Sequence, residues 1–267
     1  MARRNFYEII KSAGINITKE YNRINELFET TESGQSVRDL IEEAFLEFPK
    51  SFRGRTISLE DFDETFGFHK KMFMGEVSLE ELLLRCEYII NLCVQLNKYY
   101  ALYLDDTDQY NIKLLIDTIN ECIDELGFMK TIVEGVIIYI EKDAAVISVA
   151  EILPEHLAIS VLEYNHYRLK GDLIRKRKIL KEMADNIEPE RKRLREINNT
   201  LETQLFQLLN KFIRHDHSQT PYIATMKDRD IEEVYDDIYQ LWLFAKLNID
   251  NITRRDRMKD LLNQINS

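Results

Sequence analysis

The sequence predicts a mainly α-helical protein with one small β-hairpin. Apolar residues recur at helical spacing over most of the 267-residue chain, and only 8 Gly and 4 Pro interrupt it. All-β folds need many turns, so this scarcity favours long helices joined by few connections. A hydrophobic content of 45% and a charged content of 31% are typical of a well-folded globular protein.

The first half of the chain is expected to begin with short helices. Helical periodicity covers residues 5–13, residues 18–30, and a stretch that Ser36 caps and Pro49 ends. Residues 52–62 show no such periodicity and are expected to form a loop.

Two long helices should follow. Ser78 and Glu81 form a capping box at the start of a long buried helix. In the preceding part of the chain, Thr18 is expected to cap the helix over residues 18–30. A further helix covers about residues 108–128. The three cysteines of the chain lie in these apolar stretches: Cys86, Cys93 and Cys122. An odd count without C-x-x-C spacing predicts free, buried thiols in a reducing compartment.

The apolar spacing changes from that of a helix to that of a strand near the middle of the chain. β-branched residues flank a polar E-K-D-A segment, which predicts a hairpin with strands at 136–141 and 146–149. Pro154 suits the first turn of a new helix. The sequence therefore predicts two domains, residues 1–153 with the hairpin at its end and residues 154–267.

The second domain is expected to be a bundle of four helices. They cover about residues 154–186, 189–213, 230–247 and 252–265, and Pro189 separates the first two. The connection between the second and third helices is long for a bundle, and long ordered loops are often functional.

Basic residues concentrate between positions 168 and 195, although the whole chain has a net charge of −11 and a pI of about 5.1. This window holds eleven basic and five acidic residues, a net charge of +6, so a polyanion is expected to bind here. The alternative is a solvated, salt-bridged helix face. The residues expected to contact an RNA backbone are Arg175, Lys176, Arg177, Lys178, Arg191, Lys192, Arg193 and Arg195.

Four consecutive residues, Arg214, His215, Asp216 and His217, open the long connection. RNA cleavage through its 2′-hydroxyl needs a base and an acid, and histidine suits both because its pKa lies near neutrality. It also needs a fixed positive charge on the phosphate, which a guanidinium supplies. The cluster thus fits a metal-independent ribonuclease, with Arg214 on the phosphate, His215 and His217 carrying protons, and Asp216 orienting an imidazole.

The same four residues are also compatible with three roles that involve no cleavage of RNA. Basic side chains at a helix C-terminus can simply complement the helix dipole. The H-D-H segment could bind a metal, although such close ligands rarely complete a tetrahedron alone and no cysteine lies nearby. The cluster could also be a structural network that fixes the loop to the bundle. No cofactor is expected, since the P-loop, G-x-G-x-x-G, H-E-x-x-H and G-x-S-x-G motifs are missing.

The sequence shows no membrane segment. No apolar run approaches the roughly 18–20 residues that cross a bilayer. The opening "MARRNFYEII" turns polar too soon for a signal peptide. We therefore expect a cytoplasmic protein.

Three segments of the second half resemble the HEPN-type domains of bacterial abortive-infection proteins of the AbiJ kind. They are "YNHYRLKGDLIRKRKILKEMADNIEPERKRL", "LLNKFIRHDHS" and "IEEVYDDIYQLWLFAKLNIDN". The resemblance covers about residues 155–250, and "IRH" and "YDDIYQLWLFAKL" are its most specific pieces. The first half carries no recognised motif and is compatible with a variable N-terminal partner domain.

The resemblance implies a HEPN-like helical bundle that pairs into a homodimer, in which an arginine and a histidine of each subunit cut RNA without metal. Arg214 would be the phosphate-binding arginine, and His215 is the better match for the histidine, although it follows the arginine more closely than in the common pattern. The implied function is a metal-independent endoribonuclease of an antiphage or toxin system, with a second defence protein as partner. The alternative is a non-catalytic interaction or ligand-binding module.

Overall fold

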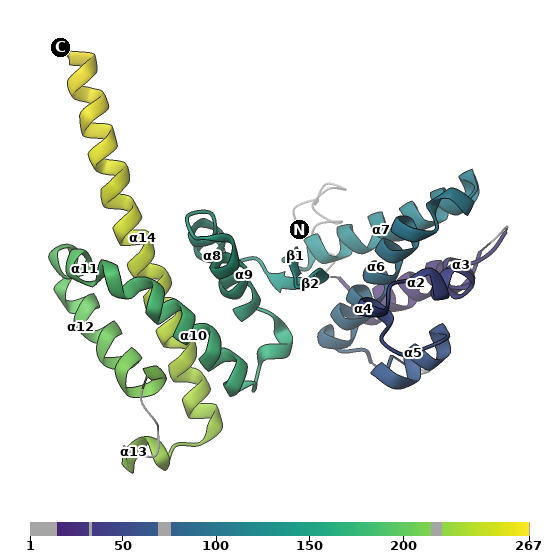
Figure 1. Ribbon diagram of the computed structural model, residues 1–267, viewed down its shortest axis with the longest axis horizontal. Coiled ribbons are helices and arrows are strands. Elements are labelled where there is room, and N and C mark those ends of the chain that lie inside the picture. The colour runs from purple at the N-terminus through teal and green to yellow at the C-terminus, as the bar shows by residue number, and fades with distance from the viewer. Residues whose placement is uncertain (1–14, 32–33, 69–75, 215–220, 267) are drawn as a thin grey trace, which may run out of the picture. The chain divides into compact units, whose positions relative to one another are not determined.

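The computed structural model divides the chain into two compact units, Met1–Tyr139 and Ile140–Ser267. Both are mainly helical, and the described residues form one two-stranded sheet, which confirms the predicted fold class (Figure 1). The division lies inside the second strand, whereas the sequence placed the domain boundary after residue 153. The residues that the structure describes are 15–31, 34–68, 76–214 and 221–266.

Unit 1 (Met1–Tyr139) consists of helices that pack on one long buried helix. They are α2 (Ile17–Glu29), α3 (Val37–Ala44), α4 (Lys50–Arg53), α5 (Leu59–Phe66), α6 (Leu79–Tyr99) and α7 (Asp106–Glu125), with 3-10 turns η1 (Phe45–Glu47) and η2 (Ala101–Tyr103). The central helix α6 contacts α2, α3 and α7. Its apolar residues Leu82, Leu83, Ile89 and Leu92 are fully buried, as expected for a helix that is apolar on most sides.

Side-chain caps fix where these helices begin. Ser36 and Ser78 each form a capping box, the second with Glu81 as predicted. The expected cap at Thr18 is wrong: Asn16 caps α2 instead, and the Thr18 hydroxyl accepts a hydrogen bond from Val77 N at 3.0 Å. The helix predicted over residues 5–13 lies outside the described residues.

The loop predicted over residues 52–62 is also wrong in part, because α4 ends there and α5 begins there. Ser58 caps α5 by accepting from Asp61 N at 3.1 Å. Between the helices, Arg53 donates to the carbonyls of Phe48 at 3.0 Å and Thr56 at 2.6 Å. These short helices depend on local caps rather than on a long apolar period, which is why periodicity alone did not indicate them.

The hairpin joins β1 (Phe128–Val133) and β2 (Val136–Glu141) through Glu134 and Gly135, both at positive φ. The strand predicted at 136–141 is therefore confirmed, but the one predicted at 146–149 is wrong, because that segment belongs to the helix α8 (Ala144–Ala150). Asp143 accepts hydrogen bonds from the first amides of α8, so the polar segment is a helix cap and not a turn.

The polar groups of β2 in unit 1 are paired with side chains of α6. Asn91 donates to the Ile137 carbonyl and accepts from the Ile137 amide, both at 2.8 Å. Tyr139 N donates to Glu87 at 2.8 Å. A helix thus takes the place of a third strand beside β2, which satisfies the backbone groups of a buried strand edge.

Unit 2 (Ile140–Ser267) is a bundle around the long helix α14. Its helices are α8 (Ala144–Ala150), α9 (Glu155–Tyr164), α10 (Leu173–Ile187), α11 (Arg191–Ile197), α12 (Asn199–Leu208), α13 (Pro221–Ala224) and α14 (Asp228–Asn266), with the 3-10 turns η3 (Tyr167–Leu169) and η4 (Glu188–Glu190) and the π-helical segment η5 (Leu209–Arg214). Trp242 is fully buried and donates its indole N–H to the Met183 carbonyl at 2.7 Å. The Tyr239 hydroxyl donates to the Val161 carbonyl at 2.8 Å.

The predicted helices of the bundle are recovered with different boundaries. The helix expected over 154–186 is two helices, α9 and α10, and Gly171 between them has a φ of 83°. The helix expected over 189–213 is interrupted where Asn198 caps α12. The long connection after it contains the short helix α13 among its described residues.

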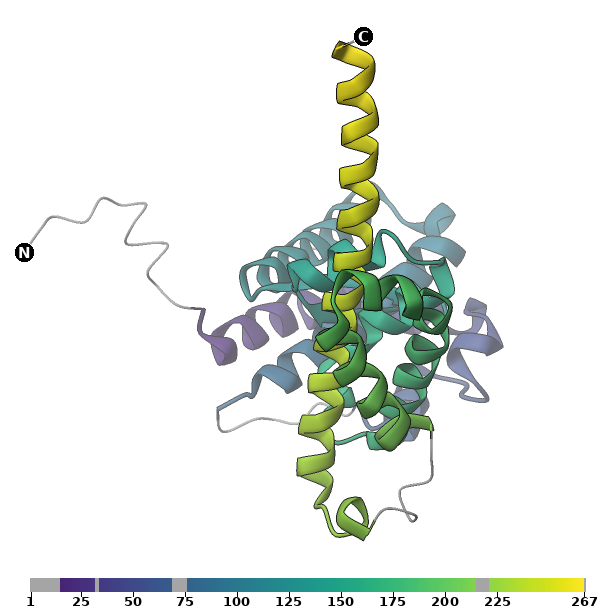
Figure 2. The same ribbon diagram turned by 90° about the vertical axis from the view of Figure 1, so that its left-hand side faces the viewer.

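The two last helices predicted, 230–247 and 252–265, are one continuous helix, α14. No glycine or proline separates them, so nothing in the backbone ends the first. The end of α14 projects beyond the other helices of unit 2, and from Thr253 on its described side chains are exposed (Figure 2). Among the described residues no helix is both long and apolar enough to cross a bilayer.

Candidate functional site

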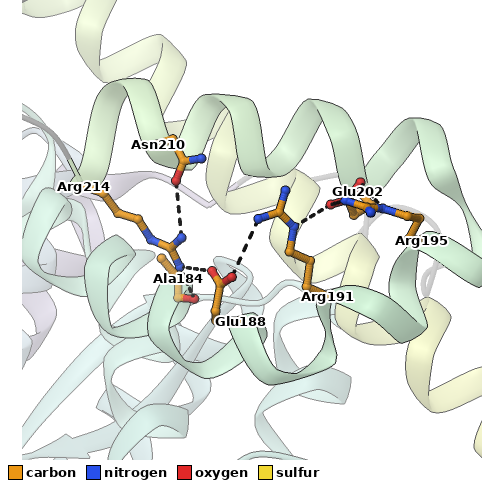
Figure 3. Close-up of polar contacts among 7 residues, drawn as sticks. All are labelled: Ala184, Glu188, Arg191, Arg195, Glu202, Asn210 and Arg214. Atoms are coloured by element: carbon orange, nitrogen blue, oxygen red, sulfur yellow. Dashed lines mark hydrogen bonds and ion pairs between the residues drawn. The ribbon is translucent and has the colours of Figure 1, made fainter.

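Arg214 is the last residue of the π-helical segment η5, which continues α12. Single π-turns occur often at functional sites. Its guanidinium donates to Asn210 Oδ1 at 3.3 Å and to the Ala184 carbonyl at 3.1 Å, and it forms an ion pair with Glu188 (Figure 3). The side chain keeps an exposed fraction of 24%. The structure thus fixes a positive charge against the end of α10 and leaves it partly open to solvent.

The other three residues of the predicted catalytic cluster are His215, Asp216 and His217, and they lie outside the described residues. Their predicted roles therefore stay predictions. Among the described residues, no group of three or more His, Cys, Asp or Glu side chains is placed to hold a metal ion.

A second guanidinium, that of Arg191, lies next to the same carboxylate. Arg191 Nη1 is 3.8 Å from Glu188 Oε1, and its Cζ lies 4.4 Å from the centroid of the Phe206 ring. The Cζ of Arg214 is 6.0 Å from that centroid. Two arginines that are distant in sequence therefore converge on one half-exposed glutamate beside one buried aromatic ring.

A buried glutamate holds Arg191 on its other side. Glu202 has an exposed fraction of 1%, and it accepts from Arg191 Nε at 2.6 Å and from Arg195 Nη2 at 2.8 Å. The pKa of Glu202 is lowered to about 2, mainly by the hydrogen bond from Arg195. Burial opposes this shift, whereas the hydrogen bond and the charge of Arg191 lower the pKa further. Glu202 therefore stays ionised well into the acid range.

The predicted RNA-binding residues on α10 are largely engaged within unit 2. Arg175 forms a two-pronged ion pair with Glu163 at 2.8 and 2.5 Å. Lys176 is buried and lies 2.8 Å from each of two carboxylates of α14. Arg177 donates to the Ile213 carbonyl at 3.1 Å. These contacts fit the alternative for the basic window, a salt-bridged helix surface.

The remaining residues of the predicted RNA-binding set are more exposed to solvent. Lys178 on α10 and Lys192 on α11 are exposed, and neither makes an ion pair with a described residue. Arg193 is exposed and donates to Thr253 Oγ1 at 2.7 Å. Arg195 is exposed on one side while it binds Glu202 on the other.

Sequence reasoning missed the acidic members of this network, Glu188 and Glu202, and the amide of Asn210. One signal was present: Glu188 precedes Arg191 by three residues, and Asn210 precedes Arg214 by four, which places each pair on one helix face. The contact between Arg214 and Glu188 had no such signal, because it depends on how η5 packs against η4.

The cysteines offer no competing nucleophile. All three are free and buried, as predicted. Burial raises the pKa of Cys93 to about 12 and that of Cys122 to about 11, so both thiols are protonated at neutral pH.

Comparison of the chain with protein-family models, curated proteins and solved structures finds no match. The resemblance to HEPN-type domains therefore stays a prediction from the three sequence segments. Any function rests on the residues and contacts described above.

Proposed function

We propose that unit 2 is an RNA-binding, metal-independent endoribonuclease module of a cytoplasmic bacterial antiphage or toxin system, acting as a homodimer. The observation that carries this proposal is the position of Arg214, which presents a fixed, partly exposed guanidinium directly before His215, Asp216 and His217. Unit 1 would serve as the sensing or restraining part, with a second defence protein as its partner.

The chemistry assigned to these residues needs no cofactor. Arg214 would hold the phosphate and stabilise the charge that develops on it. His215 and His217 would take the proton from the 2′-hydroxyl and return one to the leaving 5′-oxygen, and Asp216 would orient an imidazole. The fixed guanidinium supports this assignment because it does not need to be ordered when the substrate arrives.

The basic surface would supply affinity that does not depend on sequence. Lys178 and Lys192 are the exposed lysines of the predicted set and would contact backbone phosphates. Arg193 and Arg195 are exposed too, although each already binds a side chain of unit 2. The engaged residues Arg175, Lys176 and Arg177 would stabilise the bundle instead.

A second function is a non-catalytic interaction or ligand-binding module. The favouring observation is that Arg214 already contacts Asn210, Ala184 and Glu188 within the same unit. In such a module the arginine joins η5 to the end of α10, and its removal lowers stability without removing any activity.

The two functions are separated by incubating the full chain with total RNA in the presence of a chelator. Arg214→Gln and His215→Ala should each lower cleavage by about 100-fold or more if these residues act on the phosphate and the protons. Lys211→Gln is the matched control, because Lys211 is exposed on the same segment η5. This variant should cleave RNA as the unmodified chain does.

No cleavage by the unmodified chain, or equal cleavage by all variants, would refute the ribonuclease. A lower melting temperature of Arg214→Gln, in a chain that cleaves nothing, would favour the non-catalytic module.

A further inference from the structure

The carboxylate of Glu188 lies between the guanidinium groups of Arg191 and Arg214 (Figure 3). Arg214 Nη2 pairs with one oxygen of this carboxylate, and Arg191 Nη1 is 3.8 Å from the other. Guanidinium groups bind phosphate as well as carboxylate. The Glu188 carboxylate therefore fills the space between two positive charges.

Both arginines are held by contacts that do not involve Glu188. Arg191 donates to the buried Glu202 at 2.6 Å and lies over the Phe206 ring. Arg214 donates to Asn210 and to the Ala184 carbonyl. The two positive charges would thus stay in place if the Glu188 side chain turned away, and an anion arriving there would meet an ordered site.

Glu188 has the largest exposed fraction of the three side chains. Its side chain has an exposed fraction of 42%, against 38% for Arg191 and 24% for Arg214. It belongs to η4, the single 3-10 turn between α10 and α11. Its Oε2, which faces Arg214, is buried and has no hydrogen-bond partner among the described residues, so charge attraction alone holds it there. A side chain on a short turn can move into solvent without opening the core.

We propose that Arg191 and Arg214 form a phosphate subsite that Glu188 occupies as an internal anion, and that a phosphodiester of an RNA chain displaces this carboxylate when it binds. The identity of the ligand rests on the proposed function, whereas the subsite does not. Glu188 is then a competitor of the ligand and weakens its binding at neutral pH. The exchange replaces one negative charge by another, so the arginines remain neutralised to the same extent.

The test uses the full chain and the variant Glu188→Gln, which keeps the size of the side chain and removes its charge. Binding of a fluorescein-labelled single-stranded RNA should tighten by about 5–10-fold, because the competing anion is gone. Asp185→Asn is the matched control, since Asp185 is exposed one turn earlier on α10 and makes no ion pair with a described residue. It changes the net charge equally and should alter binding by less than about 2-fold.

A second comparison isolates the arginines. In an Arg191→Gln background the gain from Glu188→Gln should disappear, which a double-mutant cycle measures directly. Glu188→Asp covers the case in which Glu188→Gln does not fold: it draws the carboxylate back by one methylene and should tighten binding in the same direction, by a smaller factor.

Inorganic phosphate distinguishes a failure of the subsite from a failure of the proposed function. At constant ionic strength, phosphate should raise the melting temperature of Glu188→Gln more than that of Asp185→Asn. If this holds but no variant binds RNA, the subsite stands and the RNA function is wrong. If RNA binds but Glu188→Gln and Asp185→Asn behave alike with both ligands, the subsite is wrong. If neither ligand binds any variant, both proposals fail.

Discussion

Replacement of Glu202 by glutamine tests how much the arginine network stabilises unit 2. Glu202→Gln keeps the volume of the side chain and removes the buried charge between Arg191 and Arg195. The pKa of Glu202 falls from the ordinary 4.5 to about 2, and a difference of this size corresponds to ~3.4 kcal/mol. The two arginines have exposed fractions of 38% and 55%, so solvent screens part of this energy. We expect a loss of about 1–2 kcal/mol in the free energy of unfolding at pH 7.

The effect should depend on pH in a definite direction. A carboxyl group whose pKa is lower in the folded state stabilises the fold above its unfolded pKa, and this stabilisation is lost as the pH falls. For Glu202 the window runs from 4.5 down to about 2. The difference in the free energy of unfolding between the unmodified chain and Glu202→Gln should therefore reach its full value above about pH 5.5. It should fall to roughly 40% of that value by pH 3.

The assay is urea unfolding followed by tryptophan fluorescence. Trp242 is the single tryptophan of the chain and is fully buried in unit 2, so the signal reports on this unit alone. Glu196→Gln is the control, because Glu196 is exposed on α11 and forms no ion pair with a described residue. A Glu202→Gln protein as stable as the control at pH 7, or a difference that grows toward pH 3, would refute the reasoning.

Two further predictions concern other parts of the chain. Tyr139→Phe should leave the free energy of unfolding unchanged or raise it by about 0.5–1 kcal/mol, since the buried Tyr139 hydroxyl has no hydrogen-bond partner among the described residues. Urea unfolding followed by circular dichroism measures this free energy. A loss above about 1 kcal/mol would count against the prediction. The projecting end of α14 carries an exposed apolar row made of Met258, Leu261, Leu262 and Ile265. If the proposed homodimer uses this row, the double variant Leu261→Lys/Leu262→Lys should be a monomer in light scattering. The control is Asn263→Lys; a dimer in all variants would exclude this interface, and a monomeric unmodified chain would exclude the homodimer.

The helical class of the fold is predictable from the sequence because long apolar periods specify long helices. The capping box at Ser78 and Glu81 even located the start of α6. A strand was wrongly predicted at 146–149 because β-branched residues favour strands. Instead, Asp143 caps a helix there, and Val146 and Val149 pack in the core of unit 2. Tertiary packing outweighed the local preference, as it commonly does for short apolar runs.

The candidate site was predictable only in its composition. Arg214 and the basic residues of α10 and α11 stand out in the sequence, but their partners do not. Glu163 and Asp236 reach Arg175 and Lys176 through the packing of whole helices, and no local spacing reveals that. Basic residues counted as available for a ligand therefore included several that the bundle itself neutralises.

The two functions proposed for unit 2 differ in whether one contact can exchange. If Glu188 leaves Arg214 readily, the guanidinium is an anion site with an internal occupant, and the residues after it can act on a bound phosphate. If the contact persists, the same arginine joins η5 to η4 and α10 and only stabilises the bundle. The half-exposed position of Glu188, together with the separate contacts that hold both arginines, favours exchange. A buried and unexchangeable pair would instead resemble Lys176 and its two carboxylates, whose lysine is only 7% exposed.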